Sequence, residues 1–478
     1  MNICKKKHWL LAGALCVASG LVWGQSATAM AETVNVNREV KSTGTGTRVI
    51  DFSKSDKKAR TMPVESAKAV NPAATIPGPS VSYIHLVRLK WQEVPSAVSY
   101  QVVILKSAQD TEANIVMAQD QIFTNGVDIN LSRFGRDAGN FYWKVCPLDY
   151  NGKPVGNGHF SKPQPITSGS TLEPKAPQPT TQYDRMDYMP VYPVYSWIPY
   201  DDAKHHEVQV YRVTDNGDNL VRTLNADQYD IYEDGGYTTA GKYYWRVRAV
   251  DASGSPISDW SEKSYFEVKA QATPVAALGD SITHGGGAMS VPPGYLMYDW
   301  ESYSEVPVKN IGVSGNTTAD MLNRFERDVL PFSPKVLVIM GGVNDYRGTV
   351  DGWTAVQNLK AIRDKCDAYG ITPVFLTVTP INPTLMIKRA HIEQPPFDWI
   401  VHQRYINDWI MKQRYHVDIA SALADSTGWL RSNYTTDGLH PDYFGKKYIG
   451  EQVGRFLTKT FPWITTKLTK KPIPVYGQ

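Results

Sequence analysis

Cysteine is scarce in this sequence, with four residues among 478. Cys4 and Cys16 lie in an N-terminal segment that we expect to be removed, while Cys146 and Cys366 lie in segments that we expect to form different domains. A disulfide framework needs cysteines that can pair, and a structural zinc site needs thiolates at short spacings. The sequence therefore argues against both.

Net charge is also small. The chain carries a net charge of +3, and Lys5, Lys6 and Lys7 bring three positive charges to the same N-terminal segment, which has no acidic residue. The remainder of the chain has no net charge and no basic stripe of the kind that binds a phosphate backbone. We therefore expect no nucleic-acid partner. The apolar content of 42% is enough for several hydrophobic cores.

Long hydrophobic runs are missing except near the N-terminus, where LLAGALCVASGLVWG follows KKKHW and precedes the small-residue stretch QSATAMA. This pattern indicates a secretory signal peptide over 1–31. The run is too short for a transmembrane helix and does not recur, so we expect no integral membrane segment in the mature chain. Leu15 precedes Cys16, where a lipoprotein signal has a small residue, which argues against a lipid anchor. We expect a secreted protein that is extracellular, on the cell surface or periplasmic.

The composition of two segments predicts that they do not form packed domains. Residues 32–75 are polar, lack sustained periodicity and contain a Thr-Gly run, which is typical of a flexible leader. We expect residues 466–478 to form a C-terminal tail, since KKPIPVYGQ has no apolar run.

The chain repeats itself between these leader residues and about residue 270. LKWQEVPSAVSYQVVIL matches YSWIPYDDAKHHEVQVY, and NFYWKVCPLDYNGKPVG matches KYYWRVRAVDASGSPIS. Short alternating strands with Gly, Pro, Asn and Asp between them predict two β-sandwiches, over 76–170 and 178–270. YYWRVRAVD and SDWSE resemble fibronectin type III modules, although the first copy has HFSKP in place of DWSEK. Cys146 aligns with Arg248 at an outward position, which predicts a surface thiol.

After residue 270 the pattern changes to apolar runs separated by helical stretches. The runs are VAALGD, VKNIGV, KVLVIMGG, TPVFLTVTP and the shorter HVDIA. Strands alternating with helices predict a parallel sheet covered on both faces, with its active site at the carboxyl ends of the strands. One helix is expected before Gly370, because apolar residues recur there at three- and four-residue spacing, and Cys366 lies on that stripe. The stripe consists of Val356, Leu359, Ile362, Cys366 and Tyr369.

The stretch GDSITHGGG follows the first of these runs and presents Ser281 in a turn. A serine hydroxyl is a weak nucleophile that needs a base, a group orienting that base, and donors for the oxyanion. IGVSGNTT places Gly315 after the second strand, and MGGVNDY places Asn344 after the third. TTDGLHPDYFG places Asp437 and His440 three residues apart in one turn before the last helix. Asp437 can therefore hold one ring nitrogen while the other faces Ser281.

These four blocks, in this order, resemble the SGNH (GDSL-type) hydrolases over 271–465. The resemblance implies a three-layer α/β/α, flavodoxin-like fold and ester hydrolysis without a cofactor or metal. It implies Ser281 as nucleophile, His440 as base and Asp437 as the residue that orients it. The backbone N–H groups of Ser281 and Gly315, with the side-chain amide of Asn344, are implied as the oxyanion hole.

Several neighbouring residues have competing interpretations. We interpret Asp280 as an acceptor of backbone hydrogen bonds that fixes the loop, in preference to a catalytic acid. His284 is an alternative base without a partner in the local sequence, so His440 is preferred and His284 stays a candidate pocket wall. Tyr295 and Trp300 either stack on a sugar or pack a helix and its entry loop; we retain His284, Tyr295 and Trp300 as candidate substrate contacts.

Two other site classes find no support. No Gly-x-Ser-x-Gly occurs, which disfavours the nucleophile-elbow hydrolases. There is no His-Glu-x-x-His, and five further histidines show no metal-ligand spacing. They are His205, His206, His391, His402 and His416.

We therefore predict a secreted serine esterase whose substrate is a short acyl ester, favouring acetyl, on an extracellular or envelope glycan. Export and β-sandwich modules suit a polymer outside the cytoplasm. One alternative is a lipase or lysophospholipase acting on lipid esters. The other is a surface carbohydrate-binding or adhesive protein with a vestigial hydrolase domain, which the complete set of site residues argues against.

Overall fold

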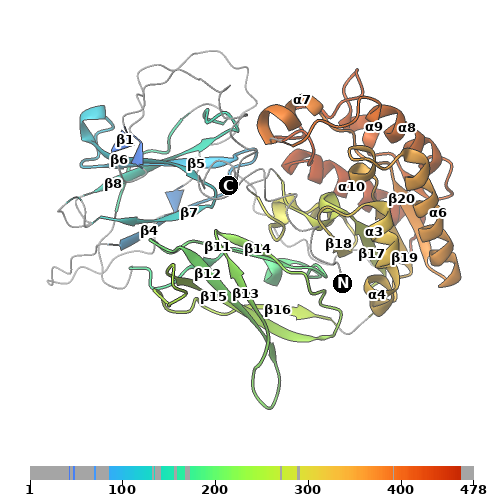
Figure 1. Ribbon diagram of the computed structural model, residues 1–478, viewed down its shortest axis with the longest axis horizontal. Coiled ribbons are helices and arrows are strands. Elements are labelled where there is room, and N and C mark those ends of the chain that lie inside the picture. Colours follow the sequence, from blue (N-terminus) through green and yellow to red (C-terminus); the bar gives the residue numbers. More distant parts are fainter. Residues whose placement is uncertain are drawn as a thin grey trace. The chain divides into compact units, whose positions relative to one another are not determined.

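The computed structural model divides into two compact units (Figure 1). The boundary falls between Glu173 and Pro174, except that Gly126–Ile129 groups with the second unit. The predicted signal peptide, most of the leader and the tail lie outside the described residues. The structure describes residues 42–43, 47–48, 69–70, 86–131, 134, 141–155, 159–166, 173–269, 272–287, 291–390 and 392–464.

The first unit contains most of the first repeat. Its elements are β1 (Ser42–Thr43), β2 (Thr47–Arg48), β3 (Ala69–Val70), β4 (Leu86–Trp91), β5 (Ser99–Leu105), η1 (Glu112–Asn114), β6 (Ile115–Ile122), β8 (Tyr142–Leu148) and β9 (Gln164–Pro165). β7 (Gly126–Asn130) completes the strands of this repeat. β5 and β8 are central in an antiparallel sheet of order β6-β5-β8-β9. Trp91 and Trp143 are both buried, with ring centroids 6.3 Å apart.

The prediction that Cys146 is a surface thiol is wrong. Cys146 is fully buried on β8, and burial raises the pKa of its thiol to about 12. It pairs with Gln101 of β5, which is buried as well, as is Lys144 on the same face. Because both faces of β8 are covered, strand alternation no longer separates an exposed face from a buried one.

The second repeat lies in the second unit and consists of two antiparallel sheets. Its elements are β10 (Gln178–Pro179), η5 (Tyr183–Arg185), β11 (Val194–Ile198), β12 (His205–Val213), β13 (Asn219–Ala226), β14 (Asp230–Tyr232), β15 (Gly241–Val250) and β16 (Ser264–Val268). The sheet orders are β13-β12-β15-β16 and β10-β11-β14. The ring centroids of Trp197 and Trp245 lie 6.5 Å apart, which is close to the spacing of Trp91 and Trp143 in the first repeat. The paired tryptophans fit the internal repeat, while its fibronectin type III identity stays a prediction.

The C-terminal part forms a five-stranded parallel sheet. Its strands are β17 (Val275–Gly279), β18 (Lys309–Gly312), β19 (Val336–Met340), β20 (Thr372–Leu376) and β21 (His416–Val417), in the order β18-β17-β19-β20-β21. All five lie in the predicted apolar runs, and all their pairings are parallel. The order reverses beside β17, which is where doubly wound sheets bind ligands at the carboxyl ends of their strands.

Helices cover this sheet, in agreement with the predicted α/β/α arrangement. The longer ones are α3 (Thr318–Asn323), α6 (Gly352–Ala368), α8 (Trp399–Ile410) and α10 (Tyr443–Thr460). α6 contacts α3 and α8, whereas α10 contacts η6 (Leu296–Tyr298) and η7 (Trp300–Tyr303). The shorter ones are α2 (Ser281–His284), α4 (Phe325–Val329), η8 (Leu330–Phe332), α5 (Val343–Tyr346), α7 (Pro383–Leu385), η9 (Met386–Ala390) and α9 (Ala420–Leu423). Cys366 is fully buried on α6, as its apolar stripe predicts.

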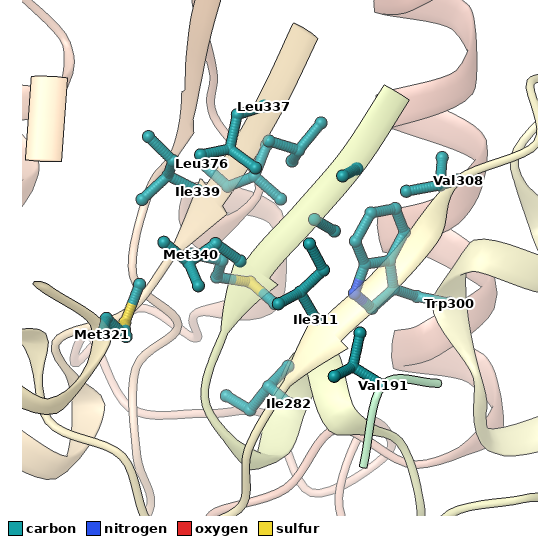
Figure 2. Close-up of a cluster of buried hydrophobic side chains, with 14 of the residues drawn as sticks. Val191, Ile282, Trp300, Val308, Ile311, Met321, Leu337, Ile339, Met340 and Leu376 are labelled. Atoms are coloured by element: carbon teal, nitrogen blue, oxygen red, sulfur yellow. The ribbon is translucent and has the colours of Figure 1, made fainter. Parts of the chain in front are cut away.

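The core of the second unit runs from the second repeat into the parallel sheet. Figure 2 shows Val191, which precedes β11, in one cluster with Ile311 of β18 and Ile339 of β19. Trp300 of η7 lies in the same cluster. The second repeat and the sheet therefore share one hydrophobic core. Within the described residues, no helix has the length and apolar character needed to cross a membrane.

Candidate active site

Ser281 begins α2 directly after β17 and faces a histidine from the other end of the domain. Its Oγ lies 3.0 Å from His440 Nε2. Asp280 caps the helix, since its Oδ1 accepts the Ile282 N–H at 2.9 Å, which is the loop-fixing role expected from the sequence. Burial raises the pKa of Asp280 to about 6. As the first residue of a helix, Ser281 has a backbone N–H without an intrahelical partner.

A single turn before α10 presents both Asp437 and His440. His440 Nδ1 lies 2.7 Å from Asp437 Oδ2, while Asp437 Oδ1 accepts the N–H groups of Leu439 and His440, each at 2.8 Å. Burial acts to raise the pKa of Asp437, but His440 and these hydrogen bonds bring it below its ordinary value. Gly438 has φ +85°, and a Cβ there would lie 2.5 Å from Asn382 O. The turn is therefore fixed by its own backbone and by the segment after β20.

The two predicted oxyanion donors lie on the loop after β18 and on α5 after β19. Gly315 has φ +82°, in the left-handed region that favours glycine. Asn344 Nδ2 donates to Asn316 O at 2.9 Å, and its Oδ1 accepts from Arg347 Nε at 2.9 Å. These two bonds orient the amide, and the second hydrogen of Nδ2 has no acceptor among the residues that the structure describes.

Two buried charged residues near this site were not singled out from the sequence. Asp345, next to Asn344, accepts the Thr318 N–H at 2.9 Å and the Thr318 hydroxyl at 2.6 Å, which joins α5 to the start of α3. Lys446 of α10 donates to Ile282 O at 2.6 Å, and burial lowers its pKa to about 8. Its spacing of three and seven residues from Ile449 and Val453 placed it on the buried stripe of α10, and this signal could have found it.

The three candidate substrate contacts have other surroundings. His284 is buried, with Nε2 2.6 Å from Tyr192 O and Nδ1 2.9 Å from Ser314 Oγ. The hydroxyl of Tyr295 lies 2.7 Å from Thr180 Oγ1. Trp300 is fully buried in the core (Figure 2). The sugar-stacking interpretation is therefore wrong for Trp300, and His284 and Tyr295 have their polar atoms bonded to the protein.

No group of three or more potential metal ligands occurs among the described residues, a set that leaves out His391. The remaining histidines of the sequence analysis have separate environments. His205 pairs with Asp227 and His402 with Asp398, while His416 bonds the Gln413 carbonyl and His206 packs on Trp197.

Comparison with known proteins bears on the C-terminal part of the chain. Residues 277–447 match the GDSL-like lipase/acylhydrolase family, and this range contains all five predicted catalytic and oxyanion residues. A curated relative, the uncharacterized lipoprotein YqeF of Bacillus subtilis (strain 168), is 30% identical over 128 residues. The match covers 22% of this chain and 49% of that protein, so this chain spans about half the length of its curated relative.

Solved structures show low overall similarity to this chain. A lipase/acylhydrolase from Enterococcus faecalis is 21% identical, with a TM-score of 0.33, covering 41% of this chain and 98% of that one. A GDSL-like lipase from Bacteroides thetaiotaomicron is 20% identical, with a TM-score of 0.31, covering 39% and 88%. An acetylxylan esterase from Geobacillus stearothermophilus is 19% identical, with a TM-score of 0.30, covering 42% and 99%.

Proposed function

Taking residues 277–447 as a GDSL-like lipase/acylhydrolase domain, we propose that this protein is a serine esterase with Ser281 as its nucleophile. One observation carries the proposal. Ser281 Oγ, His440 and Asp437 form a continuous hydrogen-bonded series, with distances of 3.0 Å and 2.7 Å. A nucleophile, a base and a group orienting the base are the parts that acyl transfer needs.

The reaction proceeds in two halves. Ser281 Oγ attacks the ester carbonyl carbon while His440 Nε2 takes its proton, and Asp437 stabilises the resulting imidazolium through Nδ1. The carbonyl oxygen becomes an oxyanion, which the backbone N–H groups of Ser281 and Gly315 and the Asn344 amide stabilise. The C–O bond breaks, His440 returns the proton to the departing alcohol, and an acyl-enzyme remains. Water then attacks the acyl-enzyme with His440 again as base, which releases the acid and regenerates Ser281.

The substrate in this proposal is a short acyl ester, with acetyl preferred, on a carbohydrate outside the cytoplasm. Support comes from the predicted signal peptide over 1–31 and from the two β repeats ahead of the hydrolase domain. A protein directed to the cell exterior meets polymeric glycans there, and β modules in tandem suit a polymeric substrate. The lipid-ester alternative differs in the length of the acyl chain, which provides the test.

Hydrolysis of p-nitrophenyl esters, from acetate to long acyl chains, tests both parts of the proposal. We expect turnover to fall steeply as the chain lengthens and to be abolished in the matched Ser281→Ala variant. A preference for long chains would contradict the short-acyl proposal and favour a lipid ester. Undiminished activity of Ser281→Ala would contradict the esterase mechanism itself.

A further inference from the structure

Residues 189–191 of the second repeat form hydrogen bonds with β18, an edge strand of the parallel sheet. The Val191 N–H donates to Asn310 O at 3.0 Å, and Lys309 Nζ donates to Met189 O at 2.5 Å. Lys309 and Asn310 belong to β18, which is an edge strand of the parallel sheet. The loop that follows β18, 313–316, carries Gly315, and we call it the oxyanion loop.

The next residue of the chain, Tyr192, reaches the oxyanion loop through His284. His284 Nε2 lies 2.6 Å from the carbonyl oxygen of Tyr192, and since a carbonyl only accepts, Nε2 carries the proton. Burial lowers the pKa of His284 to about 4, so the ring is neutral at neutral pH and Nδ1 is an acceptor. Nδ1 accepts from Ser314 Oγ at 2.9 Å and from Ser314 N at 3.2 Å. His284 therefore joins Tyr192 to the residue immediately before Gly315.

A second connection starts at the hydroxyl of the same tyrosine. Tyr192 donates to Asp328 Oδ2 at 2.9 Å, and the buried Asp328 accepts from Arg324 Nη1 at 3.2 Å. Arg324 donates through Nε to Asn316 Oδ1 at 2.6 Å and through Nη2 to Gly279 O at 2.9 Å. The second connection therefore reaches the far end of the oxyanion loop and the end of β17, two residues before the nucleophile.

The residues on both sides of Gly315, Ser314 and Asn316, are thus connected to one residue of the second repeat. We propose that Tyr192 is a positioning residue for the oxyanion hole, which makes the second repeat part of the catalytic unit. This inference rests on the proposed function, since it requires that Gly315 and Asn344 hold an oxyanion. Such donors accelerate a reaction because they are fixed before charge develops, so a loosened loop lowers kcat more than it raises KM.

Two variants of the full chain each break one connection. Tyr192→Phe removes the hydroxyl but keeps the ring and the carbonyl. His284→Asn keeps an oxygen acceptor near the place of Nδ1 and loses the donor to Tyr192. We expect each to lower kcat on a p-nitrophenyl ester on the order of tenfold, with KM changed by less than about twofold.

Lys309→Met is the matched control. It removes a buried hydrogen bond between the same two regions, to Met189 O, at the opposite end of β18 from the oxyanion loop. We expect its kcat to stay within about twofold of the unmodified chain. Urea unfolding of all three variants identifies any loss of kcat that comes from a smaller folded fraction.

A double-mutant cycle separates positioning from general support of the fold. In an Asn344→Ala background the oxyanion hole is already defective, so adding Tyr192→Phe should cost less than about threefold in kcat. A full tenfold loss there would show that Tyr192 acts independently of the oxyanion hole and would overturn the inference. Unchanged kcat in both Tyr192→Phe and His284→Asn, with Ser281→Ala inactive, would overturn the inference but leave the proposed function in place. Wild-type activity of Ser281→Ala would overturn both.

Discussion

At the scale of single residues, Asp437 sets most of the geometry of the catalytic turn. One of its oxygens accepts two backbone N–H groups of the turn and the other faces His440 Nδ1 at 2.7 Å. The carboxylate therefore shapes the turn and orients the imidazole at the same time. Because burial alone would raise its pKa, the hydrogen bonds and the nearby His440 are what bring the pKa below its usual value.

Replacing this carboxylate by an amide tests its role. In Asp437→Asn the amide can donate to Nδ1, which moves the ring proton to Nε2 and removes the acceptor that Ser281 needs. We expect kcat on p-nitrophenyl acetate to fall about 10³- to 10⁴-fold, with the fold retained. A variant that keeps more than about a tenth of wild-type kcat would remove Asp437 from this role.

A substitution at Asn344 tests whether its side-chain amide belongs to the oxyanion hole. Asn344→Ala removes the amide that Asn316 O and Arg347 orient. Loss of one oxyanion donor should lower kcat by about a hundredfold or more, because that donor matters most in the transition state. Steady-state kinetics beside the unmodified chain measures this, and an equal rate would exclude Asn344 as a donor.

Local motifs in the sequence indicated which neighbouring residues lie together, and they missed contacts between distant segments. Asp437 and His440 are three residues apart, so their spacing alone placed them in one turn. The partners of His284 lie 30 and 92 positions away, and no local pattern contains that information. The interpretation of Trp300 as a substrate contact was wrong for a similar reason. Only the packed core shows that its ring is fully buried.

At the scale of elements, α2 approaches β18 so closely that a side chain has no space between them. A Cβ added at Gly312 would lie 2.6 Å from His284 Cα. The atom that it meets is backbone, which cannot rotate away. The position of α2, and of Ser281 at its start, therefore depends on a residue without a side chain at the end of β18.

We expect Gly312→Ala to displace α2 and to impair catalysis together with stability. Overpacking of this kind costs about 1–3 kcal/mol, and kcat should fall more than about tenfold because Ser281 moves relative to His440. Urea unfolding and steady-state kinetics check the two effects.

β12 carries a buried histidine that we expect to make the free energy of unfolding depend on pH. His206 is buried, burial lowers its pKa to about 4, and in the described part of the chain neither ring nitrogen has a hydrogen-bond partner. The ordinary pKa of a histidine in an unfolded chain is about 6.5, so the unfolded state binds more protons between the two values. We therefore expect His206 to lower the free energy of unfolding as the pH falls through this window, by up to about 3 kcal/mol.

The variant His206→Phe should remove this contribution. It keeps a ring against Trp197 and has no group to protonate. Urea unfolding at about pH 7 and about pH 5 should show a smaller loss of stability in the variant than in the unmodified chain. An identical loss in both proteins would show that His206 does not titrate in this way.

Elements were easier to predict than their surroundings. All five strands of the parallel sheet lie in the predicted apolar runs, because strands buried on both faces leave a continuous apolar signal. The prediction that Cys146 is a surface thiol was wrong because an alternating pattern shows which face of a strand a residue lies on, but not what covers that face. The covering of β8 depends on tertiary packing that the strand's own sequence does not encode.

At the scale of the whole molecule, the change of pattern near residue 270 is not a break in the core. Trp197 and Trp245 of the second repeat belong to the same buried cluster as Val275 and Ile339 of the sheet. A boundary drawn from sequence periodicity separates two kinds of secondary structure that pack as one unit. This continuity gives Tyr192 its route to the oxyanion loop.

The proposed mechanism depends on a nucleophilic Ser281 that His440 activates. Its most direct test is to treat the full chain with a fluorophosphonate, which reacts with activated serines, and to map the adduct by peptide mass spectrometry. We expect one adduct, on Ser281, which is absent in Ser281→Ala and forms at least about a thousandfold more slowly in His440→Ala. An adduct on another residue, no adduct, or an unchanged rate in His440→Ala would contradict it.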